Sequence, residues 1–314
     1  MNELSEELER WYQGGDYLTV GAAGRHIFYR QWGDVSAVAK DTLLILHGFP
    51  ESSFSFRKVI DGLLADFKRV VVFDMLGYGF SDKPNTGYSY SLIDQADVAL
   101  QVYQALSIRG GHILSHDMGT SVLTELVYRQ VSGELPDFFD QGFQSFTFTN
   151  GSMVLRFAQL RFMQRMLLTK FGSILSQFTR YSVFKRSIQS AHSDDTGELL
   201  GELLGEEDIQ HLWESLTYKG GHRKSHLLIR YLNDRKRYEQ SRWLPALSDM
   251  SKVLPIHFCW GTADQVARFE MVDYLVQKHC PQAIVSKMHG VGHFCQIAGP
   301  DIWLKNIRNF YQGL

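Results

Sequence analysis

The segment Ser115-His116-Asp117-Met118-Gly119 follows a short apolar run and precedes a helical pattern. Small residues two positions before and two positions after a central residue permit a sharp strand-to-helix turn that exposes the central side chain, as in a nucleophile elbow. The central residue is Asp117, and a carboxylate attacks a tetrahedral carbon that bears a leaving group or belongs to a strained ring. Such an attack forms an alkyl ester, which water must then cleave. The alternative is that Asp117 only caps the following helix, because Asp is a favoured N-cap residue.

Other polar residues also follow strand-like runs. His47 follows the apolar run Leu43 to Leu46, Asp264 follows another apolar run, and His293 lies just past the last one. In an open parallel sheet, ligands bind beyond the carboxyl ends of the strands. We therefore expect these side chains to lie near Asp117 and to form the functional site.

The elements that position these residues alternate between strands and helices, which predicts an α/β fold with a mostly parallel sheet and helices on both faces. The alternation stops after residue 151 and resumes near residue 245. Between these points the periodicity is helical, with breaks near His192 to Gly197 and at Gly220-Gly221. The predicted organisation is a core of residues 1–151 and 245–314 with an inserted all-helical module of residues 152–244.

Composition excludes several classes of function. The 314 residues are 44% hydrophobic and carry a formal net charge of -2, so neither nucleic acid nor an anionic membrane is indicated as a partner. Residues 1–13 lack the apolar core of a signal peptide, and no segment approaches the roughly 20 apolar residues of a membrane span. The cysteines Cys259, Cys280 and Cys295 have no metal-type spacing, which predicts free thiols, a cytoplasmic location and neither a metal nor a cofactor.

The order nucleophile, acid, histidine, together with the His47-Gly-Phe-Pro50 turn, resembles the α/β-hydrolase superfamily over essentially the whole chain. With an aspartate at the elbow, the chain resembles the branch of this superfamily that contains epoxide hydrolases, haloalkane dehalogenases and fluoroacetate dehalogenases. Within this branch, the segments Tyr231 to Arg235 and Arg242 to Leu247 resemble the mesoderm-specific transcript group of hydrolase-like proteins. The resemblance implies that the helical insertion is a cap over the active site.

The resemblance also implies a role for each site residue. Asp117 would be the nucleophile, Asp264 would orient the histidine, and His293 would activate water as a neutral imidazole. The backbone N–H groups of Phe49 and Met118 match the family's oxyanion donors. Because the turn must direct the Phe49 N–H at this site, the Phe49–Pro50 peptide is predicted to be cis.

Several residues compete for these roles. Asp264 could be an ordinary loop carboxylate, and His289 is a rival base four residues before His293. His112 and His116, which flank the elbow strand, are interpreted as structural. Asn150 occupies a position where some relatives keep their acid, but an amide carries no charge, which favours Asp264.

The departures from each family concern the leaving group. Haloalkane dehalogenases hold the halide with side-chain N–H groups directly after the nucleophile and after the His-Gly turn, where this chain has Met118 and Phe49. Fluoroacetate dehalogenases hold the substrate carboxylate with arginines, where this chain has Met118 and Ser121.

Epoxide hydrolases instead need a phenol from the cap, and Tyr231 is the candidate proton donor. We therefore predict an epoxide hydrolase for a small apolar organic substrate. A dehalogenase with an atypical halide site and a non-catalytic ligand-binding protein of the same fold remain the alternatives. The further candidates for substrate contact are His47, Tyr181, Tyr218 and Tyr238.

Overall fold

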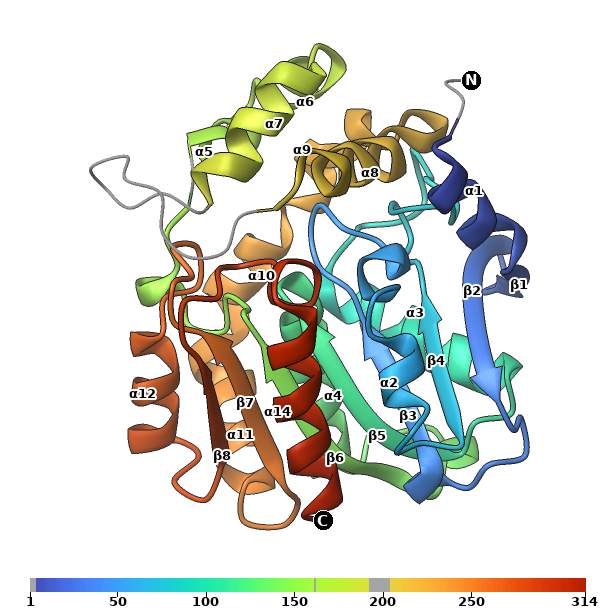
Figure 1. Ribbon diagram of the computed structural model, residues 1–314, viewed down its shortest axis with the longest axis vertical. Helices are drawn as coiled ribbons and strands as arrows, with labels where there is room; N and C mark the ends of the chain where they lie inside the picture. Colours follow the sequence, from blue (N-terminus) through green and yellow to red (C-terminus); the bar gives the residue numbers. More distant parts are fainter. Residues whose placement is uncertain (1–3, 161, 192–203) are drawn as a thin grey trace.

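The computed structural model describes residues 4–160, 162–191 and 204–314 (Figure 1). Its centre is a single eight-stranded sheet with the order β1-β2-β4-β3-β5-β6-β7-β8. The first two pairings are antiparallel, and all pairings from β4 to β8 are parallel. The predicted α/β fold is confirmed. The strands are β1 (Asp16–Val20), β2 (Arg25–Gly33), β3 (Thr42–Leu46), β4 (Arg69–Phe73), β5 (Gly110–His116), β6 (Gly142–Thr149), β7 (Ile256–Gly261) and β8 (Ile284–Met288).

Helices cover both faces of the sheet because β3, β4, β5 and β7 are buried throughout and have no polar face to offer solvent. One apolar core lies between the sheet and α3, α4, α11 and α12, and a second lies between the sheet and α1, α2 and α14. The helices and 3-10 turns of this part are α1 (Glu6–Gln13), η1 (Ala39–Asp41), η2 (Ser53–Phe56), α2 (Ile60–Leu63), α3 (Leu92–Ala105), α4 (Met118–Val131), η3 (Asp137–Phe139), α11 (Leu244–Met250), α12 (Glu270–Lys278), α13 (Cys295–Ala298) and α14 (Pro300–Gln312).

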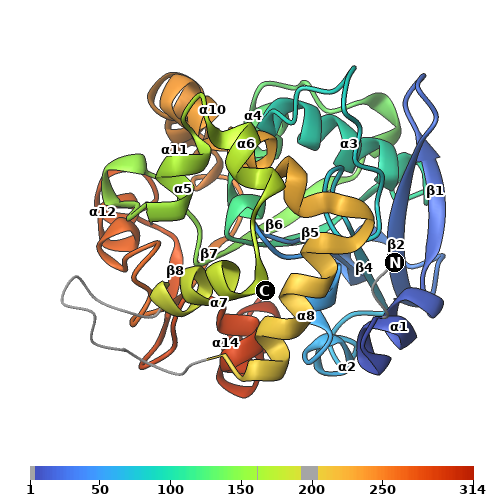
Figure 2. The same cartoon turned by 90° about the horizontal axis from the view of Figure 1, so that it is seen from above.

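A helical layer inserted between β6 and β7 lies above the sheet (Figure 2). The predicted boundary at residue 244 falls where the π-helical turn η6 meets α11. The Gly220-Gly221 break falls within η5, where Lys219 and Gly220 have positive φ. The predicted break near His192 to Gly197 lies outside the described residues. The inserted elements are η4 (Leu155–Phe157), α5 (Phe162–Leu167), α6 (Gly172–Gln177), α7 (Tyr181–Ser190), α8 (Glu206–Thr217), η5 (Tyr218–Lys224), α9 (Ser225–Leu228), α10 (Tyr231–Tyr238) and η6 (Glu239–Trp243).

The pattern of residues 56–65 predicts a single helical segment, but the structure differs here. It forms the 3-10 turn η2 and the short helix α2 instead of one continuous helix. The residues of η2 are all buried, and the backbone N–H of Ser53 donates to the Asp74 carboxylate at 2.7 Å. Tertiary contacts therefore override the local pattern here. Among the described helices, none is long and apolar enough to cross a membrane.

Candidate active site

The turn between β5 and α4 holds Asp117 in a strained backbone conformation. Its φ is 46° and its ψ is -117°, a combination that non-glycine residues adopt at a cost of about 1–3 kcal/mol. Gly119 makes the turn possible, because a Cβ atom there would lie 2.6 Å from the carbonyl oxygens of Leu46 and His47. The Asp117 side chain makes no capping hydrogen bond to α4. The geometry is that of the elbow and not of an N-cap.

The two carboxylate oxygens of Asp117 have different partners. Oδ1 accepts a hydrogen bond from the backbone N–H of Phe49 at 2.7 Å, and Oδ2 lies 3.3 Å from His293 Nε2. The Phe49–Pro50 peptide is cis, which confirms the prediction. Met118 is the first residue of α4, so its backbone N–H has no acceptor within the helix. One of the two predicted oxyanion donors, the Phe49 N–H, thus binds Oδ1, and Oδ2 faces His293.

His293 lies between two carboxylates. Its Nδ1 atom donates to Asp264 Oδ2 at 2.9 Å, while Nε2 faces Asp117. The rival His289 is exposed to solvent. Asp264 Oδ1 accepts the backbone N–H groups of Val266 and Ala267 at 2.7 and 2.9 Å. This carboxylate is therefore fixed from both sides and orients the imidazole.

Asn150 supplies a further contact to this acid. Its Nδ2 donates to Asp264 Oδ2 at 2.7 Å, and its Oδ1 accepts the backbone N–H of Gly261 at 3.0 Å. An aspartate at position 150 would place a second negative charge beside Asp264. The amide instead positions the acid that faces His293.

The charges of these groups are coupled. Burial alone would lower the pKa of His293, but the negative charges of Asp264 and Asp117 outweigh it and raise the pKa to about 10. Burial alone would raise the pKa of Asp117, but the hydrogen bond and charge of His293, with the Phe49 N–H, hold it below its usual value. In the resting site these interactions favour an imidazolium between the two carboxylates.

A buried network behind the elbow contains His116, which the sequence analysis interpreted as structural, and adds Glu51 and Gln296, which it did not single out. His116 Nδ1 lies 2.5 Å from Glu51 Oε2, and His116 Nε2 donates to the carbonyl oxygen of His293 at 2.9 Å. Glu51 Oε1 accepts from Gln296 Nε2 at 2.8 Å. Burial opposes a charged His116, but Glu51 and the neighbouring Cys295 raise its pKa well above the usual value. Hydrogen bonds of this pair connect the elbow to the loop of His293. In the sequence, the feature that could have indicated the pair is the glutamate directly after the His-Gly-Phe-Pro turn.

This pair predicts a pH-dependent loss of stability in Glu51→Gln. Breaking a buried ion pair on one side typically costs about 3–5 kcal/mol. The raised pKa of His116 contributes stability that is fully present below the unfolded pKa of about 6.5 and is lost as pH rises through the folded pKa. Urea unfolding should therefore show the largest difference from the parent protein in mildly acidic buffer and a smaller one in alkaline buffer. The exposed Glu270→Gln serves as the control, and an equal loss at every pH would contradict a charged His116.

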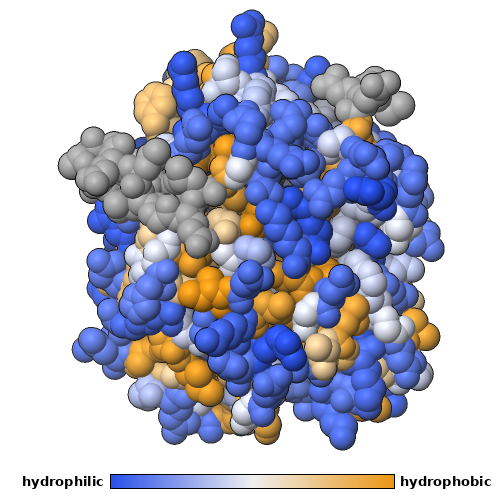
Figure 3. Space-filling view, viewed as in Figure 1, coloured by the Kyte–Doolittle hydropathy of each residue, from blue (hydrophilic) through white to orange (hydrophobic). Residues whose placement is uncertain are grey.

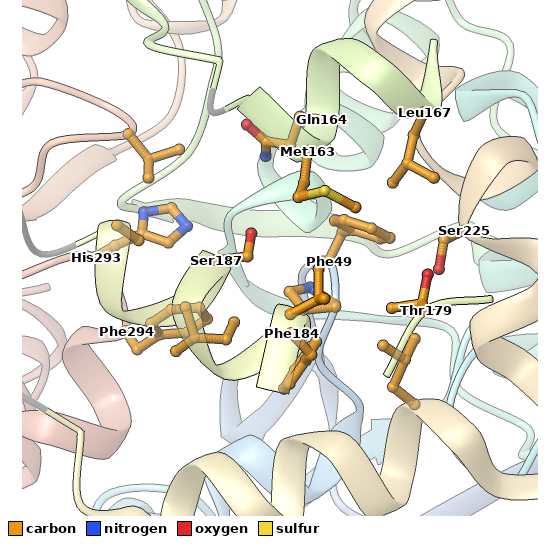
Figure 4. Close-up of a pocket in the computed structure, with 16 residues that line it drawn as sticks. Phe49, Met163, Gln164, Leu167, Thr179, Phe184, Ser187, Ser225, His293 and Phe294 are labelled. Atoms are coloured by element: carbon orange, nitrogen blue, oxygen red, sulfur yellow. The ribbon is translucent and has the colours of Figure 1, made fainter. Parts of the chain in front are cut away.

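An apolar cavity of about 80 Å³ adjoins the site, between the core and the helical layer (Figure 4). His293 lies at one end, and Leu167 and Ser225 lie at the other. The cavity is lined by Phe49, Pro50, Met163, Gln164, Leu167, Thr179, Val183, Phe184, Ser187, Ile188, Ala191, Leu216, Ser225, Val266, His293 and Phe294.

Tyr231 is the predicted cap tyrosine whose phenol is affected by the charge of Asp117, although it is not among the described residues that line the cavity. It is buried on α10, where burial and then the negative charge of Asp117 raise its pKa well above the usual value, so the phenol keeps its proton. Arg235, one turn further along α10, donates from Nε to Ser121 Oγ at 3.0 Å and to the Ser152 carbonyl at 3.1 Å. Because Ser121 belongs to α4, this contact holds α10 against the helix that follows the nucleophile.

Tyr78 is a second phenol that sequence reasoning missed. It lies on the loop after β4 and is fully buried, with its ring edge-on to His47 and Phe49. Burial raises its pKa, and the charges of Tyr231 and Asp117 raise it further. In the sequence, Tyr78 could have been singled out by its position in the Gly77-Tyr78-Gly79 loop, which follows a strand-like run.

The other predicted substrate contacts have different partners in the structure. The Tyr181 hydroxyl donates to Glu206 at 2.7 Å, the Tyr218 ring packs edge-on against Phe80, and the Tyr238 ring packs against Trp243. None of the three is among the residues that line the cavity. Packing within the cap and against the core determines their orientation, and their contact with a substrate stays a prediction.

The predicted substrate contact His47 has partners within the protein at both ring nitrogens. Its Nδ1 lies 2.9 Å from the Gly48 carbonyl, and its Nε2 accepts the backbone N–H of Met75 at 2.9 Å. Burial lowers its pKa, which favours the neutral form that these two bonds require. With both ring nitrogens occupied, His47 fixes the turn that carries the Phe49 N–H, and its contact with a substrate stays a prediction.

The fold and this arrangement define an α/β-hydrolase: residues 41–300 match the family described as the alpha/beta hydrolase fold, and the chain belongs to it. The chain is 36% identical over 300 residues to "Putative hydrolase LipZ" of Mycobacterium tuberculosis, covering 95% of this chain and 96% of the relative. It is 31% identical over 322 residues to the human "Mesoderm-specific transcript homolog protein", covering 99% and 88%.

Among solved structures, a haloalkane dehalogenase DbeA loop variant from Bradyrhizobium elkanii superimposes with a TM-score of 0.73 at 18% identity, covering 95% of this chain and 97% of that one. At this identity the likeness concerns the fold. The resemblance to the mesoderm-specific transcript proteins and to the wider superfamily is confirmed, and the protein is a hydrolase of the α/β type.

Proposed function

We propose that the protein is an epoxide hydrolase that acts through an alkyl ester on Asp117. The observation that supports the proposal is that the two oxygens of this carboxylate have different partners. Oδ1 accepts the Phe49 N–H, and Oδ2 lies beside the His293–Asp264 pair. A carboxylate held this way has one oxygen ready to attack and the other already in the place where negative charge develops later.

In the first step, Asp117 Oδ2 attacks a ring carbon of the epoxide, and the bond from that carbon to the ring oxygen breaks. The ring oxygen takes the phenolic proton of Tyr231. The imidazolium of His293 holds one proton in the resting site, and this proton restores the phenol. The step therefore ends with a neutral ester, a neutral phenol and a neutral imidazole, without a proton from solvent.

In the second step, His293 acts as the base. Formation of the ester removes the charge of Asp117, one of the two charges that raise the pKa of His293, so the imidazole becomes a competent base after the first step. It takes a proton from water, and the hydroxide adds to the ester carbonyl carbon. The oxyanion on Oδ1 is held by the backbone N–H groups of Phe49 and Met118. Collapse releases the diol and regenerates the carboxylate and the imidazolium.

The surroundings favour an epoxide over a haloalkane. Phe49 and Met118 have no side-chain N–H group to bind a departing halide, whereas Tyr231 offers a proton to an opening ring oxygen. No lysine or arginine is among the described residues that line the cavity, which favours an uncharged substrate. Its volume of about 80 Å³ is well below the roughly 150 Å³ of a cavity that holds benzene, so a short terminal epoxide fits better than an aryl epoxide.

The test compares diol formation from a short terminal epoxide with bromide release from a bromoalkane of the same length. We expect diol and little bromide. Tyr231→Phe should lower diol formation by about 10²- to 10⁴-fold, since this is the usual contribution of general-acid catalysis. Tyr238→Phe, which lies on the same helix, is the matched control and should retain activity.

Rapid bromide release without diol would reverse the choice of leaving group and favour the dehalogenase alternative. If Tyr231→Phe were unaffected while Tyr78→Phe lost activity, the proton donor would be Tyr78. If neither substrate were turned over and neither alkylated Asp117, the non-catalytic alternative would be favoured.

A further inference from the structure

The outer face of the cap exposes a row of large apolar side chains. Phe171, Ile174 and Phe178 are 55%, 56% and 76% exposed, and they are spaced three and four residues apart at the start of α6, within it and at its end. Phe162 on the neighbouring α5 is 73% exposed. Soluble proteins rarely gather large apolar side chains in this way unless the patch contacts a partner. We call the outward side of α5, α6 and α7, residues 162–190, the cap surface.

All charged residues in the same part of the chain are basic. Between Ser152 and Ala191 there is no Asp or Glu, so all 34 acidic residues of the protein lie elsewhere. The net charge of -2 conceals this local excess. On the cap surface, Arg165, Lys170, Arg180 and Arg186 are exposed. The basic residues of the segment are Arg156, Arg161, Arg165, Lys170, Arg180, Lys185 and Arg186.

The cap surface stands at one end of the molecule, on the far side of the helical layer from the sheet (Figures 1 and 2). Orange and deep blue side chains lie beside one another over α6 and α7 at the top of the space-filling view (Figure 3). The inner side of the same helices lines the cavity. Val183 belongs to both sides, because it is 37% exposed and also lines the cavity. The cap surface is therefore continuous with the cavity wall.

We propose that the cap surface binds an anionic lipid bilayer. Large apolar side chains enter the boundary between headgroups and acyl chains, and flanking Lys and Arg side chains bind anionic headgroups. Exposed basic residues beside an apolar row are complementary to such a surface, although Glu206 of the neighbouring α8 pairs with Lys185 at one side of it. The protein would lie on the bilayer with its cavity wall turned toward the lipid, and no segment would cross it. The proposal does not depend on the chemistry at Asp117.

The experiment is flotation of the purified full-length protein with two kinds of vesicle: phosphatidylcholine alone, and equal parts of phosphatidylcholine and phosphatidylglycerol. We expect binding to the anionic vesicles that weakens as salt is added. Lys170→Glu with Arg180→Glu should reduce the partition coefficient by at least tenfold, because each basic residue near an anionic surface contributes about a fivefold gain. Phe171→Ser with Phe178→Ser should reduce it by about tenfold or more through lost apolar burial.

Matched controls lie elsewhere on the surface. Lys278→Glu with Lys305→Glu makes the same change of charge at exposed positions on α12 and α14, and Val253→Ser removes a 74% exposed apolar side chain. These variants should bind like the parent. Thermal unfolding of every variant shows that a loss of binding is not a loss of folding.

Absence of binding to anionic vesicles would overturn the proposal, as would equal losses in the control variants. A concentration-dependent dimer in light scattering that Phe171→Ser with Phe178→Ser dissociates, without vesicle binding, would assign the cap surface to a second copy of the chain. If the protein bound both kinds of vesicle, and Lys170→Glu with Arg180→Glu bound as tightly as the parent, electrostatic attraction would not contribute. That result would overturn the choice of an anionic bilayer.

Discussion

Asp117→Asn is expected to abolish turnover, with a loss on the order of 10⁴- to 10⁶-fold, the range found when a catalytic nucleophile is removed. The amide has nearly the shape of the carboxylate, and its oxygen can still accept the Phe49 N–H. It cannot attack a ring carbon, because its lone pairs are far less nucleophilic than those of a carboxylate. The measurement is product formation together with intact-protein mass after incubation with substrate, which should show no added mass.

The Asn variant also removes a charge that raises the pKa of His293, so thermal unfolding must accompany the assay. Asp249→Asn is the control, since Asp249 lies on α11 and its carboxylate forms an exposed ion pair with the neighbouring Lys252 at 2.8 Å. Sustained turnover by Asp117→Asn, or a substrate adduct on a peptide without residue 117, would contradict the covalent mechanism. Slow recovery of activity with a mass gain of one unit would instead report deamidation back to aspartate.

His293→Gln is expected to separate the two halves of the reaction. Attack by Asp117 needs no base, so the variant should still form the alkyl ester, in an amount equal to the enzyme. Hydrolysis of the ester should slow by about 10²- to 10⁴-fold, because no group remains to take a proton from water. Quenched-flow kinetics should show a burst followed by almost no turnover, and proteolysis with mass spectrometry should locate the added substrate mass on the peptide that contains Asp117.

His289→Gln is the matched control, since this histidine lies four residues earlier and is exposed. It should turn over like the parent protein. If His293→Gln failed to form any ester while it remained folded, ester formation would depend on the proton that His293 supplies, and the expected separation of the two steps would fail. If His289→Gln trapped the ester instead, the two histidines would exchange roles.

In the proposed mechanism, the charges around His293 would set the order of the two steps. The charge of ionised Asp117 raises the pKa of His293 and so favours the protonated imidazole, which cannot take a proton from water. Alkylation of Asp117 would remove that charge, so the base would form only when there is an ester to cleave.

Much of the architecture could be predicted from the sequence because it depends on local patterns. Apolar runs alternating with helical periodicity predict a parallel sheet, and small residues around Asp117 predict the elbow. The breakdown of this alternation after residue 151 marked the helical insertion. The residues at strand ends could be singled out because parallel strands deliver their carboxyl ends to one edge of the sheet.

The remaining features depend on which distant residues meet. Glu51 and His116 are 65 residues apart in the chain and only their packing makes them a buried pair. The tyrosines of the cap cannot be ranked from the sequence, because all have the same phenol group. Only the packing shows that Tyr181 contacts Glu206, that Tyr218 packs against Phe80 and that Tyr238 packs against Trp243. Tyr78 was overlooked because it comes from the core and not from the cap.

By itself, the sequence determined the α/β fold, the position of the elbow and the chemistry open to an aspartate there, since these follow from short-range periodicity and residue type. Only the tertiary structure decided the charge state of His293, the phenols that accompany Asp117 and the exposed face of the cap. Charge states depend on burial and on neighbours brought together through space. Exposure depends on which side of each helix finds a packing partner, and periodicity alone does not specify that.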